Sequence, residues 1–185
     1  MTGINIGLLM LRLGFAALLF GHSTQKLFGW FRGGGPAGSG KLFETWGFRP
    51  GARLAVVAGV CELLGAGSIA LGLLTPGGCA LLIGTMTVAA SPAARNGLWA
   101  HLGGNEVPVV YAFLATVIAF TGPGRFSLDH AFGLTGFGHL WWAAIAVAAG
   151  LLAAVPMLLR RRAALRSDAA TTALTPSTSD KEVTA

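Results

Sequence analysis

Residues 55–74 read AVVAGVCELLGAGSIALGLL, an apolar stretch interrupted by one carboxylate, Glu62. Twenty helical residues, rising about 1.5 Å each, match the roughly 30 Å hydrocarbon core of a bilayer. Four small residues flank Glu62 at helical spacings of three and four: Ala58, Gly59, Gly65 and Ala66. Another helix can approach closely at such a strip. Because a charge at that depth is costly without a partner, we expect Glu62 to face protein or water and to meet a cation.

The composition of the whole chain agrees with a membrane protein. Of its 185 residues, 54% are hydrophobic and only 11% are charged, with a mean hydropathy of +0.67. A soluble domain carries about 25% charged residues, so an integral membrane protein is indicated. The net charge of +6 does not indicate nucleic-acid binding, because the basic residues flank apolar spans instead of lining one face.

Hydropathy and turn residues predict an all-α membrane protein with five spanning helices, near residues 4–31, 53–74, 78–92, 106–121 and 139–161. We expect the first four to form a bundle and the fifth, which carries no internal polar residue, to pack outside it or against another subunit. The first helix carries a polar stripe made of Arg12, His22, Ser23 and Lys26. Such a stripe faces the bundle interior or a water-filled cavity.

The segments between the helices have distinct compositions. Residues 33–40, GGGPAGSG, predict a flexible loop, and residues 41–53 mix aromatic with basic side chains, as interfacial segments do. Residues 167–185 are rich in Ser, Thr and Ala and predict a disordered tail. Most basic residues fall on the side of the C-terminus, so the positive-inside rule predicts a cytoplasmic C-terminus and an outside N-terminus.

Several site types are disfavoured. Cys61 and Cys79 belong to no CxxC pair and are interpreted as small buried thiols. His101, His130 and His139 are scattered without a carboxylate at helical spacing, so we expect no metal site. The glycine run ends in Lys41 without the Ser or Thr that a phosphate-binding loop requires.

Three segments in order resemble the DoxX family of small bacterial membrane proteins. They are LRLGFAALLFGHSTQKLFGWF at 11–31, VCELLGAGSIALGLLTP at 60–76, and GGNEVPVVYAFLATVIAFTGPGRFSLD at 103–129. The set is specific, whereas no single segment is. The resemblance implies a four-helix membrane domain over residues 1–135. A further helix with a basic end (136–166) and the tail (167–185) are additions of this chain.

The resemblance also implies candidate functions and residues. One branch of the family resembles the small subunit of thiosulfate:quinone oxidoreductase, and another is linked to a membrane redox complex with superoxide dismutase and a sulfurtransferase. The family's recurring polar positions match Arg12, His22, Lys26, Glu62, Asn105 and Glu106. Quinone is therefore the candidate cofactor.

We assign candidate roles accordingly. Glu62 and His22 are the candidate catalytic residues, exchanging a proton or donating a hydrogen bond. The candidate cofactor-binding residues are Arg12, Lys26, Asn105 and Glu106. An alternative is that Glu62 pairs with Arg12 and only fastens the first helix to the second. We expect the mixed case, in which Arg12 positions Glu62 and the carboxylate borders a ligand cavity.

Three function classes remain open. The protein is a redox-linked subunit that contacts quinone, a non-catalytic anchor that holds soluble redox proteins at the cytoplasmic face, or a carrier of small solutes or protons. In each case we expect a multi-pass protein of the cell membrane, with the lipid bilayer and soluble redox proteins or a second copy of the chain as partners, and no nucleic acid.

Overall fold

The computed structural model describes residues 2–174 and is almost entirely helical, with no strand among those residues. The α-helices are α1 (Thr2–Leu27), α2 (Gly35–Thr45), α3 (Gly51–Leu71), α4 (Thr75–Ala90), α5 (Glu106–Thr121), α6 (Leu128–Ala131) and α7 (Leu140–Leu174). Short 3₁₀ turns lie at Ala94–Asn96, Ala100–Leu102 and Thr135–Gly138. The all-α fold predicted from the sequence is confirmed.

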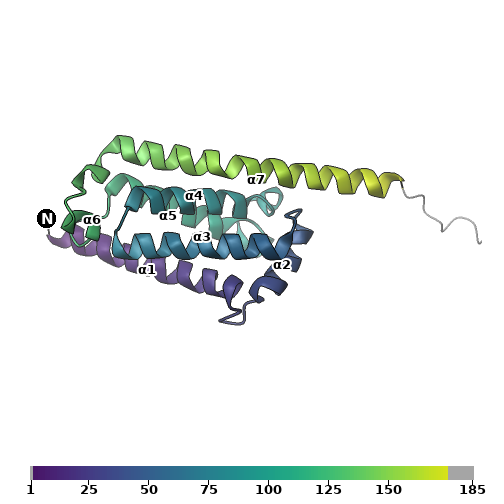
Figure 1. Cartoon of the computed structure of the whole chain (residues 1–185), viewed down its shortest axis with the longest axis horizontal. Coiled ribbons are helices and arrows are strands. Elements are labelled where there is room, and N and C mark those ends of the chain that lie inside the picture. The colour runs from purple at the N-terminus through teal and green to yellow at the C-terminus, as the bar shows by residue number, and fades with distance from the viewer. Residues whose placement is uncertain (1, 175–185) are drawn as a thin grey trace, which may run out of the picture.

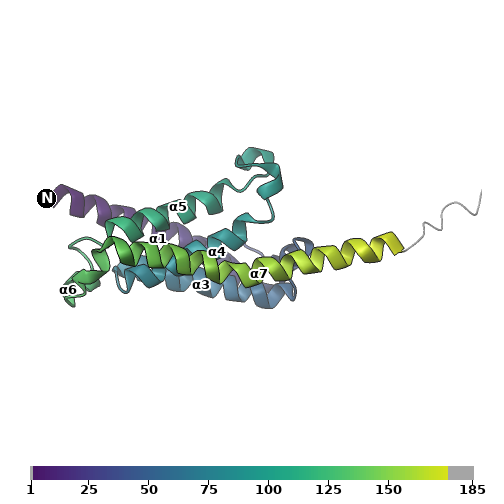
Figure 2. The same cartoon turned by 90° about the horizontal axis from the view of Figure 1, so that it is seen from above.

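The five long helices lie side by side and alternate in direction, with α4 in the middle (Figure 1). Helix α3 packs against α1 and α4, whereas α7 packs against α4 and, less extensively, α5. Seen from above, α7 lies over α3 and α4, with α5 and the connection before it to one side (Figure 2). Helices α3 and α7 are therefore separate walls on either side of α4.

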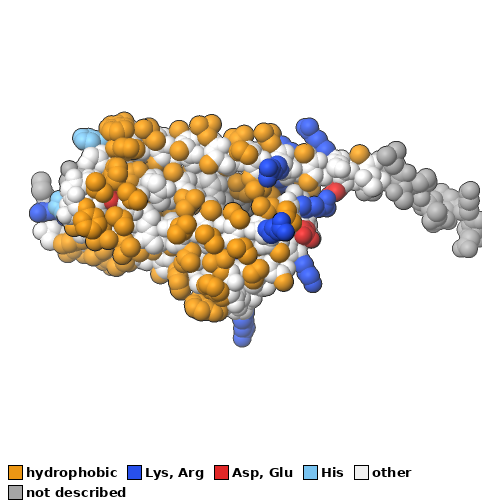
Figure 3. Space-filling model, viewed as in Figure 1, with side chains coloured by type: hydrophobic (Ala, Val, Ile, Leu, Met, Phe, Trp, Pro, Cys, Tyr) orange, Lys and Arg blue, Asp and Glu red, His pale blue; other side chains and the backbone are white. Residues whose placement is uncertain are grey.

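Three helices, α1, α3 and α7, are long and apolar enough to cross a membrane by length and composition. Helices α4 and α5 are apolar but have 16 residues each, which corresponds to about 24 Å of helix. The multi-pass membrane character is thus supported, and crossing by α4 and α5 stays a prediction. Apolar side chains cover the flank seen in Figure 3, and most of the Lys and Arg side chains visible there gather at the end near α2.

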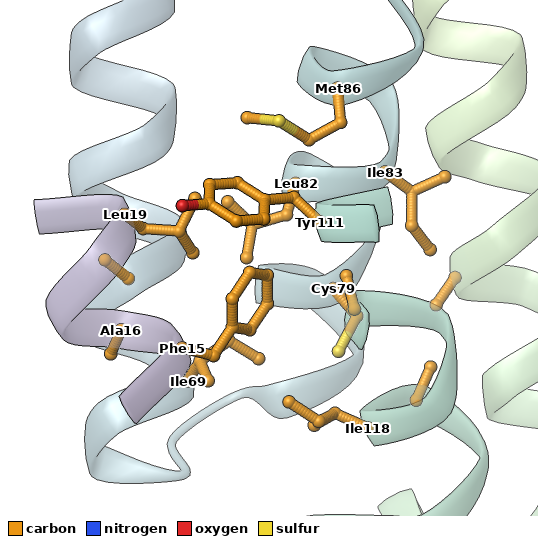
Figure 4. Close-up of a cluster of buried hydrophobic side chains, with 14 of the residues drawn as sticks. Phe15, Ala16, Leu19, Ile69, Cys79, Leu82, Ile83, Met86, Tyr111 and Ile118 are labelled. Carbon is orange, nitrogen blue, oxygen red and sulfur yellow. The ribbon is translucent and has the colours of Figure 1, made fainter. Parts of the chain in front are cut away.

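The core lies where α1, α3, α4 and α5 meet (Figure 4). The rings of Phe15 on α1 and Tyr111 on α5 meet edge to face, with centroids 5.4 Å apart. Leu82 on α4 is fully buried and fills the space left by Gly65 on α3, where a Cβ atom would come within 2.5 Å of it. The small residues around Glu62 therefore allow close helix packing, as predicted.

The segment expected to be a flexible loop is partly helical. The first helix ends at Leu27, earlier than predicted, and α2 begins at Gly35. A Cβ atom at Gly40 would lie 2.6 Å from the backbone of Ala52, so this glycine serves close packing of α2 on α3. The glycine-rich composition reflects that contact as well as the turn before α2.

The last helix departs from the sequence expectation in two ways. It continues through Leu174, so residues 167–174, expected to be disordered, are helical. The rest of that expected tail, residues 175–185, lies outside the described residues. In addition, Ala143 and Ala146 are buried in the same core as α1, α4 and α5. The helix does lie at the edge of the bundle, but folding of residues 1–135 without it stays a prediction.

The seam between α4 and α7 gives a stability test. A Cβ atom at Gly150 would lie 2.6 Å from the carbonyl oxygen of Ala80. Gly150→Ala should therefore force the helices apart and lower stability in detergent by roughly 1–3 kcal/mol. Gly67→Ala is the matched control, since Gly67 has open space around it. Equal melting temperatures for the two variants would contradict this packing.

Candidate functional site

A cavity of about 530 Å³ lies between α3, α4 and α7, and α2 and the ends of α1 and α5 complete its wall. The polar side chains that line it include His22, Lys26, Glu62 and Tyr111. Most of the other lining residues are apolar, such as Leu54, Val57, Leu81, Val88 and Met157. Its size falls within the range of small-molecule sites, which are typically apolar with a few converging polar groups.

The polar wall of the cavity is built around an ion pair. Lys26 Nζ donates to Glu62 Oε2 at 2.8 Å and also to the carbonyl oxygen of His22 at 3.3 Å. The Glu62 side chain is only 2% exposed, whereas that of Lys26 is 20% exposed. The carboxylate is therefore the buried partner, and the ammonium reaches it from the more accessible side. The pair carries no net charge.

The sequence-based prediction that Arg12 pairs with Glu62 is wrong. The first turns of α3 extend past the end of α1 and pack against α2 instead. Glu62 consequently lies level with the last turns of α1, as the contact between Gly59 and Leu27 also shows. The prediction placed Glu62 too close to Arg12 because it continued the first helix to residue 31 and treated α2 as loop.

Arg12 instead holds the other end of α3. Its side chain, 1% exposed, donates to the carbonyl oxygens of Ile69 and Ala70 at 2.8 Å each. It also donates to the carbonyl oxygens of Pro123 and Phe126 in the loop after α5. A helix C-terminus leaves carbonyl groups without intrahelical partners and favours a cation there. Arg12 is therefore a clamp at the far end of the bundle from the ion pair.

Comparison with known proteins identifies the family to which the chain belongs. A DoxX family model matches residues 7–102, a range that includes Arg12, His22, Lys26 and Glu62. The chain belongs to the DoxX family. No curated protein and no solved structure gave a match. Helices α5 and α7 lie outside the matched range. Both nevertheless line the cavity of this DoxX-family protein.

Besides Arg12, two more of the candidate cofactor-binding residues do not line the cavity. Glu106 accepts a hydrogen bond from the backbone N–H of Ala100 at 2.9 Å, and Asn105 donates to the carbonyl oxygen of Ala90 at 3.4 Å. Both side chains fasten the connection between α4 and α5. Of the six candidate positions, the structure brings together His22, Lys26 and Glu62.

Tyr111 lines the cavity and was missed from the sequence. Its ring meets the ring of His22 edge to face, with centroids 5.5 Å apart. The hydroxyl points from α5 toward α1 and α3 in Figure 4. Tyr111 is the only tyrosine in the chain and sits in an otherwise apolar helix, a signal that could have indicated a polar contact.

Asp129 was missed as well. It is 1% exposed and accepts hydrogen bonds from the backbone N–H groups of Leu74 and Thr75 and from the Thr75 hydroxyl. These bonds cap the start of α4, where free amides favour an anion. Asp129 therefore belongs to the same end of the bundle as Arg12 and is remote from the cavity.

The clamp predicts a strong effect of a conservative change. Arg12→Lys keeps the charge but cannot reach all four carbonyl groups, because an ammonium has three donors at one point. We expect a loss of about 3 kcal/mol or more, since buried carbonyls lose partners. Thermal unfolding in detergent measures this, with the exposed Arg125→Lys as control. A stable Arg12→Lys protein would contradict the clamp.

The ion pair predicts an asymmetry between its two members. Lys26→Met leaves a buried carboxylate without its cation and should cost roughly 3–5 kcal/mol. Glu62→Gln should cost less, because Lys26 is partly exposed and can keep its ammonium in a polar region.

The double variant Lys26→Met/Glu62→Gln should regain part of the loss, since it no longer contains an unpaired carboxylate. A full cycle of unfolding measurements gives the coupling between the two side chains. Additive effects in that cycle would show that the two groups do not interact.

Proposed function

We propose that this DoxX-family protein is a redox-linked membrane subunit whose cavity binds the headgroup of a quinone. The observation that carries the proposal is the cavity of about 530 Å³ whose mainly apolar wall holds His22, Tyr111 and the Lys26–Glu62 pair in one region. A quinone headgroup is uncharged and flat, with two carbonyl oxygens that accept hydrogen bonds. A neutral ion pair and two ring-bearing donors suit it better than they suit an anion.

In this proposal the chain's own residues bind the headgroup and exchange protons with it. His22 and Tyr111 are hydrogen-bond donors, and their contact holds the imidazole against the phenol ring. Reduction of a quinone takes up two electrons and two protons. A soluble electron donor supplies the electrons, and Glu62 exchanges a proton while Lys26 compensates its charge. Glu62 and His22 thus remain the proposed catalytic residues.

Orientation and location form part of the proposal. The basic end of the bundle, where α2 lies, faces the cytoplasm under the positive-inside rule, and the protein resides in the cell membrane. Soluble redox partners would then meet the protein at that end. Exposed basic residues there include Lys41, Arg49 and Arg53. A non-catalytic anchor would bind soluble proteins at the same end. This basic surface therefore does not distinguish a quinone-binding subunit from an anchor.

The test is organic extraction and mass analysis of protein purified from bacterial membranes in mild detergent. We expect quinone to co-purify, and we expect purified protein stripped of it to bind added quinone. His22→Leu and Tyr111→Phe should each weaken binding by about tenfold, the effect of losing one buried hydrogen bond.

His139→Leu is the matched control, because His139 is exposed and does not line the cavity. Glu62→Gln should bind quinone but fail to support its reduction. Protein that neither carries nor binds quinone would overturn the proposal. Soluble proteins that co-purify in that case would favour an anchor, and solute uptake into liposomes would favour a carrier.

A further inference from the structure

The cavity reaches the surface of the bundle between α3 and α7. Val57 on α3 and Ala153 on α7 both line the cavity and are both exposed on the outside of the protein, Val57 at 53%. Between them lies α4, which contributes Ala80 and Leu81 to the cavity wall. Helices α3 and α7 both pack on α4 but not extensively on each other. The space between α3 and α7 therefore stays open toward the outside of the bundle.

This opening lies at the depth of the hydrocarbon. Val57 is six residues from the start of α3, or about 9 Å along the helix. Ala153 is 13 residues from the start of the antiparallel α7, at the opposite end of the bundle, or about 20 Å along that helix. In a hydrocarbon core of roughly 30 Å these two depths coincide. The helix segments on both sides are apolar enough to span a membrane.

The walls of the opening suit an apolar chain. The residues that line the cavity from α3, α4 and α7 include Val57, Leu81, Ala153 and Met157. None of these four carries a polar side-chain group that needs a partner. Ala154, also on α7, lines the cavity, so the wall there is formed by a side chain of one methyl group. A small wall of this kind leaves room for a hydrocarbon chain between the two helices.

We propose that this opening is a lateral portal for a membrane-borne amphiphile. The polar head lies at His22 and the Lys26–Glu62 pair, and the apolar tail leaves between α3 and α7 into the bilayer. The identity of the head as a quinone rests on the proposed function above, whereas the portal does not. One wall of the portal comes from α7, a helix outside the range that matches the DoxX family.

Cys61 is a built-in reporter for this portal. It lines the cavity one residue from Glu62 and is partly exposed, whereas Cys79, the other cysteine, is fully buried in the core. In a Cys79→Ala protein, labelling by a maleimide therefore reports access to the cavity. The experiment compares N-dodecyl maleimide, which partitions into the bilayer, with a sulfonated maleimide, which stays in water, on protein in lipid vesicles.

We expect the dodecyl reagent to label Cys61 about tenfold faster or more, because transfer of each methylene from water concentrates the reagent in the bilayer, where the portal opens. Val57→Trp and Ala153→Trp should slow that labelling about fivefold or more, since an indole ring occupies the opening. The matched controls are Val60→Trp on α3 and Leu152→Trp on α7, two exposed positions that do not line the cavity. Equal labelling by both reagents, or equal rates in portal and control variants, would overturn the portal.

A second measurement separates the portal from the proposed function. A benzoquinone with a decyl tail and the same headgroup with a methyl group are titrated onto stripped protein. We expect the decyl compound to bind more tightly, and we expect Ala153→Trp to lower its affinity by a larger factor than that of the methyl compound. If labelling supports the portal but neither quinone binds, the proposed function fails and the portal stands. If both quinones bind with an affinity ratio unchanged by Ala153→Trp, the portal fails and the proposed function stands.

Discussion

The hydrogen bonds of Arg12 to the end of α3 are the interaction on which the arrangement of the helices depends. In an apolar environment the last carbonyl groups of a helix cannot turn to water, so they need donors from the protein. Arg12 supplies those donors to Ile69 and Ala70 and ties them to the loop after α5. Helix α4 begins directly after this turn. Asp129 accepts hydrogen bonds from the backbone N–H groups at its start. One cation and one anion thus saturate both sides of the turn from α3 to α4.

Within residues 2–174, the opposite end of the bundle has no such clamp. There the charged pair, Lys26 and Glu62, holds no helix terminus and borders a cavity instead. The two charge groups differ in their partners: Arg12 is satisfied mainly by backbone carbonyls, whereas Glu62 depends on one side chain. The ammonium of Lys26 stands on a long flexible stem and can adjust its position, which suits the proton exchange proposed for Glu62.

Much of this could be predicted from residue patterns, because a bilayer restricts a chain strongly. Apolar runs of the right length located the long helices, and the small residues around Glu62 indicated close helix packing, which Gly59 and Gly65 provide. The burial of Glu62 and its need for a cation followed from its depth. Whether Arg12 or Lys26 is the partner of Glu62 could not be predicted, because it depends on the axial offset between α1 and α3. That offset is set by α2, whose glycines resemble those of a loop although they serve a tight helix contact. Tyr111 and Asp129 were missed since a single residue in an apolar helix or a loop has no periodicity that would reveal its partner.

The length of α7 has a consequence for its own C-terminal end. Its 35 residues correspond to about 52 Å of helix, whereas the hydrocarbon core is only roughly 30 Å thick. The helix must therefore emerge well beyond the lipid headgroups on its side of the membrane. Near the level of the headgroups it is braced by Arg161, which donates to the carbonyl oxygen of Trp46, and by the bidentate pair of Arg49 with Asp168. The last described turns of α7, which end at Leu174, therefore project past the lipid headgroups into water.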